Sequence, residues 1–582
     1  MLPRRYSALV VVLLLTQFSF SQNHITVECS GNRYFDSDYI QKFFSGAFRT
    51  SKDTTQLDSL IRRLRTIYQD NGFFKTEIRT NWEAGALHDT VLKLRITEND
   101  AAAIKKIVTD LPDSLLPETV RSALSEREGK TFSAVALEND IQQFLNYYQN
   151  HGFPFAMISV KNVVYIPEGN SVEVFLSFSK NGLFHIDRID LTGKTETRAD
   201  VVQRELKFER GQEYNQDWID KIPTRLNRMK LFDMVGTPLF IVSPSGEGIL
   251  QIPLQDRNNN SFDGVIGYMP SAKANEKGYI TGFLDISFRN LFGSARAAAF
   301  RWKKINQLSS ELEFSYLEPW VMNYPFNISL HFLQTKQDST WVTWSIEPSV
   351  EYIASDEFSF SLDAGYSRVI PSIQTVPVFT VFNAIKSFLG FSFKYDTRDD
   401  PFVPRRGMLI NNSYSVTSKR INGPVEYITE ETKTKNKQQK AVMDLSLYLE
   451  PVKLNVVYLG LHGRVIEGDL IEVGDLFKFG GANTLRGYRE NQFLGQRIAW
   501  SNIEYRVILE KRTYAFVFFD AGYFSQGPVL DKTQSSGTVT KNGYGIGLSF
   551  QTGLGIMNVS FAMANGVSFS QGVIHFGIKN EF

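Results

Sequence analysis

Cysteine is nearly absent from this sequence, since Cys29 is the one thiol among 582 residues. A lone thiol excludes a disulfide framework and any paired-cysteine zinc or redox site. An excess of either charge is also missing, because 63 lysines and arginines face 62 aspartates and glutamates. A nucleic-acid binder needs a surplus of basic residues to contact phosphates, so that class is excluded. The seven histidines lack metal-ligand spacing and no GxSxG, Walker A or GxGxxG motif occurs, so we expect no catalysis, metal or cofactor.

Long apolar runs are missing as well. The run Ala8–Leu15 is well short of the about 20 residues that a membrane-spanning helix needs. Arg4 and Arg5 precede this run, and Ser19 and Ser21 are small residues three and one before a cut at Gln22, so residues 1–21 are predicted to be a secretory signal peptide. An uncleaved N-terminal anchor is the alternative. We expect an exported chain, in which any membrane crossing is made by strands.

The first half of the chain repeats with a period of about eighty residues. In each repeat, apolar residues at helical spacing end near a glycine or phenylalanine and lead into a β-rich stretch; Leu137, Ile141 and Phe144 are one such helical face. The predicted unit is a strand, two helices and two strands, used three times. Three ordinary α/β domains with enzymatic pockets are the alternative. The predicted domain boundaries are 22–99, 100–182 and 183–256 for the repeats and 257–582 for the remainder.

The second half alternates between apolar and polar residues, and 13% of the whole chain is aromatic. Val342, Trp344 and Ile346 share one face of a strand, while Thr343 and Ser345 share the other. Runs of this kind recur between turns, with dense aromatic residues on one face and small or charged residues on the other. This pattern is typical of a transmembrane antiparallel β-barrel built from strands of about ten residues, and the length allows about sixteen strands. A soluble all-β domain also alternates and is the alternative.

A stretch of some thirty residues separates two strand-like runs near the C-terminus and carries apolar ordering residues, which predicts a functional loop. Its motif comprises Gly480, Gly481, Leu485, Arg486, Gly487 and Tyr488. With residues 315–320, 396–407 and 518–522, this motif resembles the ordered signature of the BamA/TamA-type outer-membrane assembly factors. Leu485 stands where that family often has a β-branched residue. The repeats then resemble POTRA domains, and three of them make the layout most similar to the TamA type.

The resemblance implies that the loop folds back into the barrel lumen. Arg486 would pair there with Asp520 and Glu504, which we expect on the inward faces of the two following strands together with Phe518 and Gly522. An unpaired buried charge costs several kcal/mol, so an arginine carried into the lumen requires such acids. The resemblance also implies a barrel seam between the first and last strands. Its expected residues are Phe262, Gly264, Ile266, Tyr268, Ile574, Phe576, Ile578 and Phe582.

The family resemblance implies a bacterial outer-membrane location with the N-terminal domains in the periplasm. The expected function is to receive unfolded client strands at the POTRA domains and to insert or export them through the seam. The expected partners are outer-membrane lipids, unfolded β-barrel or autotransporter-like clients and an inner-membrane-anchored subunit that spans the periplasm. A secretion pore of the two-partner kind and a passive or structural channel are the alternatives.

Overall fold

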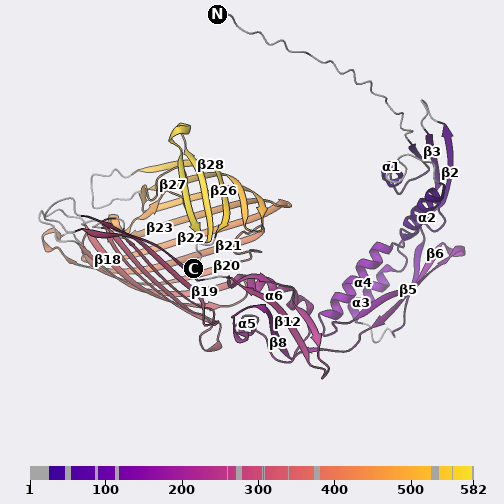
Figure 1. The fold of residues 1–582 in the computed structure, drawn as a ribbon, viewed down its shortest axis with the longest axis horizontal. Coiled ribbons are helices and arrows are strands. Elements are labelled where there is room, and N and C mark those ends of the chain that lie inside the picture. The colour runs from indigo at the N-terminus through magenta and orange to yellow at the C-terminus, as the bar shows by residue number, and fades with distance from the viewer. Residues whose placement is uncertain are drawn as a thin grey trace, which may run out of the picture. The chain divides into compact units, whose positions relative to one another are not determined.

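The computed structural model describes residues 25–579, with gaps at 46–53, 85–89, 112–116, 258–259, 271–277, 305, 307–308, 338–339, 372–380, 431, 526–536 and 553–554. The signal peptide expected at residues 1–21 and the expected seam residue Phe582 therefore lie outside the described residues. The chain divides into two compact units, of which the first contains two α/β domains and the second contains a third α/β domain and a large sheet (Figure 1).

The two domains of the first unit share one topology, a three-stranded sheet covered by two helices. The last strand of each lies in the middle, parallel to the first and antiparallel to the second. The first domain contains β1 (Ile25–Ser30), α1 (Ser37–Ser45), α2 (Thr54–Asp70), β2 (Glu77–Ala84) and β3 (Thr90–Thr97). The second contains β4 (Ala103–Thr109), α3 (Glu118–Arg127), α4 (Ala134–Gln149), β5 (Met157–Ile166) and β6 (Ser171–Ser179).

The helix α2 shows why these residues fold in this way. Leu57, Leu60, Leu64 and Tyr68 recur at helical spacing, and all four are buried against the sheet. The helix ends before Gly72, which has a φ of +91°, a value that glycine adopts without a steric penalty. The apolar stripe thus selects the buried face, and the glycine ends the helix.

The thiol of Cys29 lies on β1 beside this core, and its partial burial raises its pKa to about 11. Because the thiolate is the nucleophile, alkylation at pH 8 should be about a hundredfold slower in the folded protein than in the protein unfolded by urea. Timed labelling with iodoacetamide followed by mass spectrometry measures both rates. Equal rates in the two states would show that Cys29 is not shielded by the core.

The third α/β domain lies in the second unit and keeps the order strand, helix, helix, strand, strand. Its β12 pairs in parallel with β8 and antiparallel with β10 and β11, which together form one interrupted edge strand. Its elements are β8 (Arg188–Lys194), α5 (Ala199–Glu205), α6 (Gln216–Arg228), β10 (Phe232–Val235), β11 (Leu239–Val242) and β12 (Gly248–Asp256). Two short strands, β7 (His185–Ile186) and β9 (Gln212–Glu213), lie near its start. The predicted tandem α/β architecture is confirmed.

The large sheet has sixteen antiparallel strands, each paired with the strand of this sheet that comes next along the chain. The number and the antiparallel order match the prediction, and the sheet curves round on itself (Figure 1). The first eight strands are β13 (Ser261–Met269), β14 (Tyr279–Leu291), β15 (Arg296–Lys304), β16 (Ser310–Glu318), β17 (Phe326–Gln337), β18 (Trp341–Ile353), β19 (Phe358–Pro371) and β20 (Asn383–Asp396). The others are β21 (Gly407–Gly423), β22 (Lys435–Val452), β23 (Asn455–Gly468), β26 (Arg497–Glu510), β27 (Thr513–Ser525), β28 (Thr538–Thr552), β29 (Gly555–Ala564) and β30 (Val573–Lys579).

The two faces of the sheet differ as the alternation predicts. On β26, Asn502 and Glu504 are buried on the inner face, while Ile503 and Tyr505 are exposed on the outer face. Ile346 on β18 is likewise exposed rather than covered by a second protein layer. The outer surface is therefore a band of apolar side chains, as lipid contact requires. Among the described residues, no helix is long and apolar enough to cross a membrane.

The third α/β domain contacts the rim of the large sheet. The contacts are made by the turns that join the strands of that sheet. Arg225 on α6 pairs with Asp356, and Trp320 Nε1 donates a hydrogen bond of 2.9 Å to Glu205. The ring of Phe402 contacts two guanidinium groups, with its centroid 4.5 Å from that of Arg257 and 4.8 Å from that of Arg512. Arg257 belongs to the linker from β12 to β13, so this cation–π contact fixes the linker to the rim.

Candidate functional site

The loop between β23 and β26 folds onto the inner face of the sheet. It contains a short hairpin, β24 (Phe477–Phe479) with β25 (Phe493–Gly495), and the motif residues form its tip. Phe479 and Leu485 are fully buried and pack on Trp500 of β26 and Phe524 of β27. The inner face of the large sheet is called the wall below. Gly522 lies directly beneath Phe479, where a Cβ would come within 2.4 Å of the ring. Apolar packing therefore holds the tip inside the sheet.

The base of the loop is held by a second, charged cluster. Lys419, whose side chain is fully buried, pairs with Glu472 and lies 2.8 Å from Asp475. Lys386 also pairs with Asp475, and Gln438 donates a hydrogen bond of 2.9 Å to the same carboxylate. These partners lie on β20, β21 and β22, so the loop is anchored at its base as well as at its tip.

Arg486 is the centre of the tip. Its Nε and Nη2 donate to the two carboxylate oxygens of Asp520 at 2.8 and 2.7 Å, and its backbone N–H donates to the same carboxylate at 3.0 Å. Its Nη1 donates to Glu504 at 2.7 Å. The guanidinium also lies 3.6 Å from the ring centroid of Phe518. The structure thus brings together Arg486, Asp520, Glu504 and Phe518, which the sequence placed on different elements.

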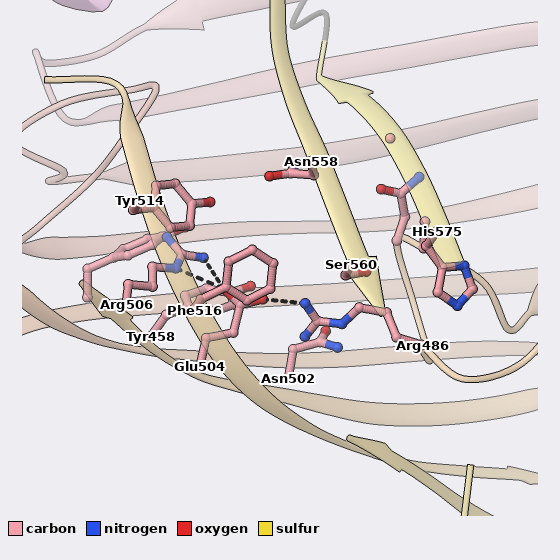
Figure 2. A pocket seen from close by; sticks show the side chains of 14 residues that line it. Tyr458, Arg486, Asn502, Glu504, Arg506, Tyr514, Phe516, Asn558, Ser560 and His575 are labelled. Atoms are coloured by element: carbon pink, nitrogen blue, oxygen red, sulfur yellow. Dashed lines mark hydrogen bonds and ion pairs between the residues drawn. The ribbon is translucent and has the colours of Figure 1, made fainter. Parts of the chain in front are cut away.

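The ion-pair chain extends one residue further than the sequence analysis anticipated. The second oxygen of Glu504 accepts a hydrogen bond of 2.8 Å from Arg506. Arg506 in turn is surrounded by the rings of Tyr448, Tyr458 and Tyr514, with centroids 5.4, 4.4 and 4.9 Å away. Figure 2 shows the two guanidinium groups on opposite sides of Glu504. Two arginines and two acids balance, so the buried cluster carries no net charge.

Asn502 and His575 are further contacts that the sequence analysis did not identify. Asn502 Nδ2 donates to Thr484 O at 2.9 Å and to Asp520 at 2.8 Å, so it joins loop and wall. The backbone N–H of Gly487 donates to His575 Nε2 at 3.1 Å. Both residues lie on inward-facing strand positions. Asn502 is two residues before Glu504, and this inward spacing is the signal that could have found it, whereas no spacing links His575 to Gly487.

The remaining motif residues complete the tip. Gly480, Gly481 and Gly487 have φ values of +105°, +109° and +92°, so the tip turns through backbone conformations that glycine adopts without strain. Tyr488 Oη donates to the carbonyl oxygen of Asn542 on β28 at 3.0 Å. A polar cavity of about 130 Å³ lies beside the tip, and Asn558 and Ser560 are among the residues that line it (Figure 2).

The expected seam residues other than Phe582 lie on the two end strands of the sheet, and no backbone pairing joins β13 to β30 among the described residues. Phe262 and Ile266 on β13 are 74% and 70% exposed, and Phe576 on β30 is 71% exposed. Tyr268 and Ile574 are also exposed. Gly264 pairs with Leu284 of β14, and the backbone of Ile578 pairs with Met557 of β29. Each end strand therefore has one neighbour and one open edge.

Two family models match the chain. Residues 290–582, half of the chain, match the Omp85 superfamily domain. Residues 104–179 match the POTRA model, described as a surface antigen variable number repeat.

Individual relatives are distant. The outer membrane protein assembly factor BamA of Nitratidesulfovibrio vulgaris is 22% identical over 432 residues, which cover 68% of this chain and 50% of that protein. The protein of the same name from Neorickettsia risticii is 21% identical over 584 residues, 93% of this chain and 74% of that one. The chain spans about half the length of the first relative. The crystal structure of BamA from Haemophilus ducreyi lacking POTRA domains 1–3 has a TM-score of 0.49 at 15% identity, over 82% of this chain and 98% of that one.

Proposed function

The chain belongs to the Omp85 superfamily, and from that premise we propose that it receives unfolded client strands at its POTRA domains and inserts or exports them through the barrel seam. The family places the barrel in the bacterial outer membrane and the POTRA domains in the periplasm. The proposed boundaries are 22–99, 100–182 and 183–256 for the POTRA domains and 257–582 for the barrel. Each of these ranges contains one complete set of the observed elements.

The observation that carries this proposal is the pair of open sheet edges at β13 and β30. A barrel wall in hydrocarbon must satisfy every backbone N–H and C=O group, and an open edge leaves a row of them available. An unfolded client strand satisfies such a row by adding itself to the sheet, which depends on backbone hydrogen bonds and tolerates many sequences. The free edge is therefore suited to accept β-strands of varied sequence, and no enzymatic step is needed.

The POTRA domains offer edges of the same kind. Strands β2 and β5 are end strands of their three-stranded sheets, with one neighbour each. On β5, Met157, Val160 and Val164 are exposed, so the edge presents apolar side chains beside its open backbone. These features support transient strand addition ahead of the barrel. Three such domains in this chain favour the TamA-type layout, which is the finer part of the proposal.

A disulfide across the seam tests the proposal. In a Cys29→Ser background, cysteines placed at Ile266 and Ile574, and at neighbouring positions on the same strands, would lock β13 to β30. We expect the locked protein in liposomes to insert an outer-membrane client at least about tenfold more slowly, since the edges are no longer free, and to recover on reduction. The matched control is Ile546→Cys with Phe561→Cys, which are paired across β28 and β29 and should not affect insertion.

The readouts separate the alternatives. Client insertion is measured by protease protection, and ion conductance is recorded across a planar bilayer of the same lipids. Undiminished insertion by the locked protein would contradict seam opening. Export of a polypeptide through the locked protein, with conductance retained, would favour the two-partner secretion pore instead.

A further inference from the structure

The tip of the inward-folded loop contacts five successive strands, from β26 to β30. Arg486 bonds to Glu504 on β26 and to Asp520 on β27. Tyr488 bonds to the backbone of β28, and Gly487 lies against the backbone of β29, where a Cβ would be 2.9 Å from Ala564 N. The same Gly487 reaches β30 through its N–H, which donates to His575 Nε2. The loop therefore reaches the last strand of the sheet, beside the seam.

The hydrogen bond to His575 is fixed in direction. Gly487 has a φ of +92° and no room for a Cβ, so the position and orientation of its N–H are set by the backbone of the tip. His575 is buried on the inner face of β30. Its Nε2 accepts the hydrogen bond, which requires a neutral imidazole with its proton on Nδ1. A residue without an acceptor at this point would leave a buried N–H unpaired.

The two end strands of the sheet, β13 and β30, differ in the bonds that hold them. Strand β30 has backbone pairs to β29 from Ile556 with Lys579 to Ala562 with Val573, and in addition the loop bond at His575. Strand β13 pairs with β14. Bonds from the loop go to β20–β22 at its base, to β23 through Gln496 O, which accepts from Ile466 N, and to β26–β30 at its tip.

We propose that His575 is a positioning residue that fastens β30 to the loop tip, so that β30 stays with the C-terminal wall while β13 is the strand that moves when the seam opens. The fastening of β30 by His575 is a property of the protein without client. The movement of β13 deepens the proposed function and rests on it.

Hydrogen–deuterium exchange of the purified full chain in detergent micelles tests the fastening directly. His575→Phe keeps an aromatic ring and removes the acceptor, so exchange in peptides covering Gly487 and residues 573–579 should rise about tenfold. His575→Gln places an amide oxygen close to the position of Nε2 and should restore exchange to within about twofold of the original rate. Rescue by glutamine separates the acceptor role from simple filling of space.

The matched control is His331→Phe, the same replacement at a lumen position on β17, where His331 Nδ1 lies 3.0 Å from Ser315 Oγ. It should leave exchange near Gly487 and in β30 unchanged. If His575→Phe does not fold, the comparison of His575→Gln with His575→Asn serves instead, because asparagine is too short to reach Gly487. Unchanged exchange in β30 with phenylalanine, or glutamine no better than phenylalanine or asparagine, would overturn the proposal.

The mobility of β13 is read in the same experiment, where its peptides should exchange faster than those of β30 in the original protein. Faster exchange in β30 than in β13 would overturn the assignment of the moving strand. None of these exchange measurements uses a client. A failure of client insertion would therefore contradict the proposed function but not the fastening of β30 by His575.

Discussion

Replacing Arg486 by alanine should lower the free energy of unfolding of the barrel by about 3–5 kcal/mol, because it leaves the buried carboxylate of Asp520 without its arginine and leaves Glu504 with Arg506 alone. Asp520 is 0% exposed and receives three of its hydrogen bonds from Arg486. The backbone bond survives the substitution, but the bidentate pair does not. The loss is measured from the temperature at which the folded band disappears on gels and from urea unfolding in micelles.

Lysine at the same position separates charge from geometry. Arg486→Lys keeps the positive charge but cannot form the planar fork that contacts Asp520 and Glu504 together, so we expect an intermediate loss. The matched control is Arg489→Ala, which removes an exposed arginine from the same loop and should change the free energy of unfolding by less than about 0.5 kcal/mol. Wild-type stability of both Arg486 variants would show that the ion-pair cluster does not hold the tip.

Much of the fold could be predicted because apolar residues recur in it at the regular spacing of a helix or a strand. The stripe of Leu57, Leu60, Leu64 and Tyr68 specifies a buried helix face, and the alternation on β26 assigns the inward and outward faces. Both patterns depend on neighbours a few residues apart, so one sequence suffices to find them. The expectation that Arg486 meets Asp520 and Glu504 came from a family resemblance, since no local pattern links positions 34 and 18 residues apart.

The parts that could not be predicted depend on contacts between distant elements. Gly487 and His575 are 88 residues apart, and their contact follows from how deep the tip reaches rather than from any spacing. The tyrosine cage of Arg506 is similar, because its rings come from β22, β23 and β27. The buried Lys419 at the base of the loop lies in a strand whose sequence shows only the usual alternation. Such sites become visible only when the register of every strand is known.

Gly543 on β28 provides the sharpest test of how closely the tip fits the wall. A Cβ at this position would lie 1.9 Å from the carbonyl oxygen of Arg486, so Gly543→Ala must push the backbone of the tip away from the wall by about 1 Å or more. The bonds from Arg486 to Asp520 are 2.7 and 2.8 Å long and would not survive such a shift. We expect a loss of about 3 kcal/mol in the free energy of unfolding, close to the effect of removing Arg486 itself.

The control for this substitution is Gly577→Ala on β30, because no heavy atom lies within 4 Å of the Cβ that it would add. Both changes add one methyl group to an inward strand position, and the second should leave unfolding unchanged within about 0.5 kcal/mol. In the double variant Gly543→Ala with Arg486→Ala, the two losses should not add, since both act through the same ion pairs. Full additivity would mean that the methyl group destabilises the wall by itself, and the close fit of the tip would then not depend on Arg486.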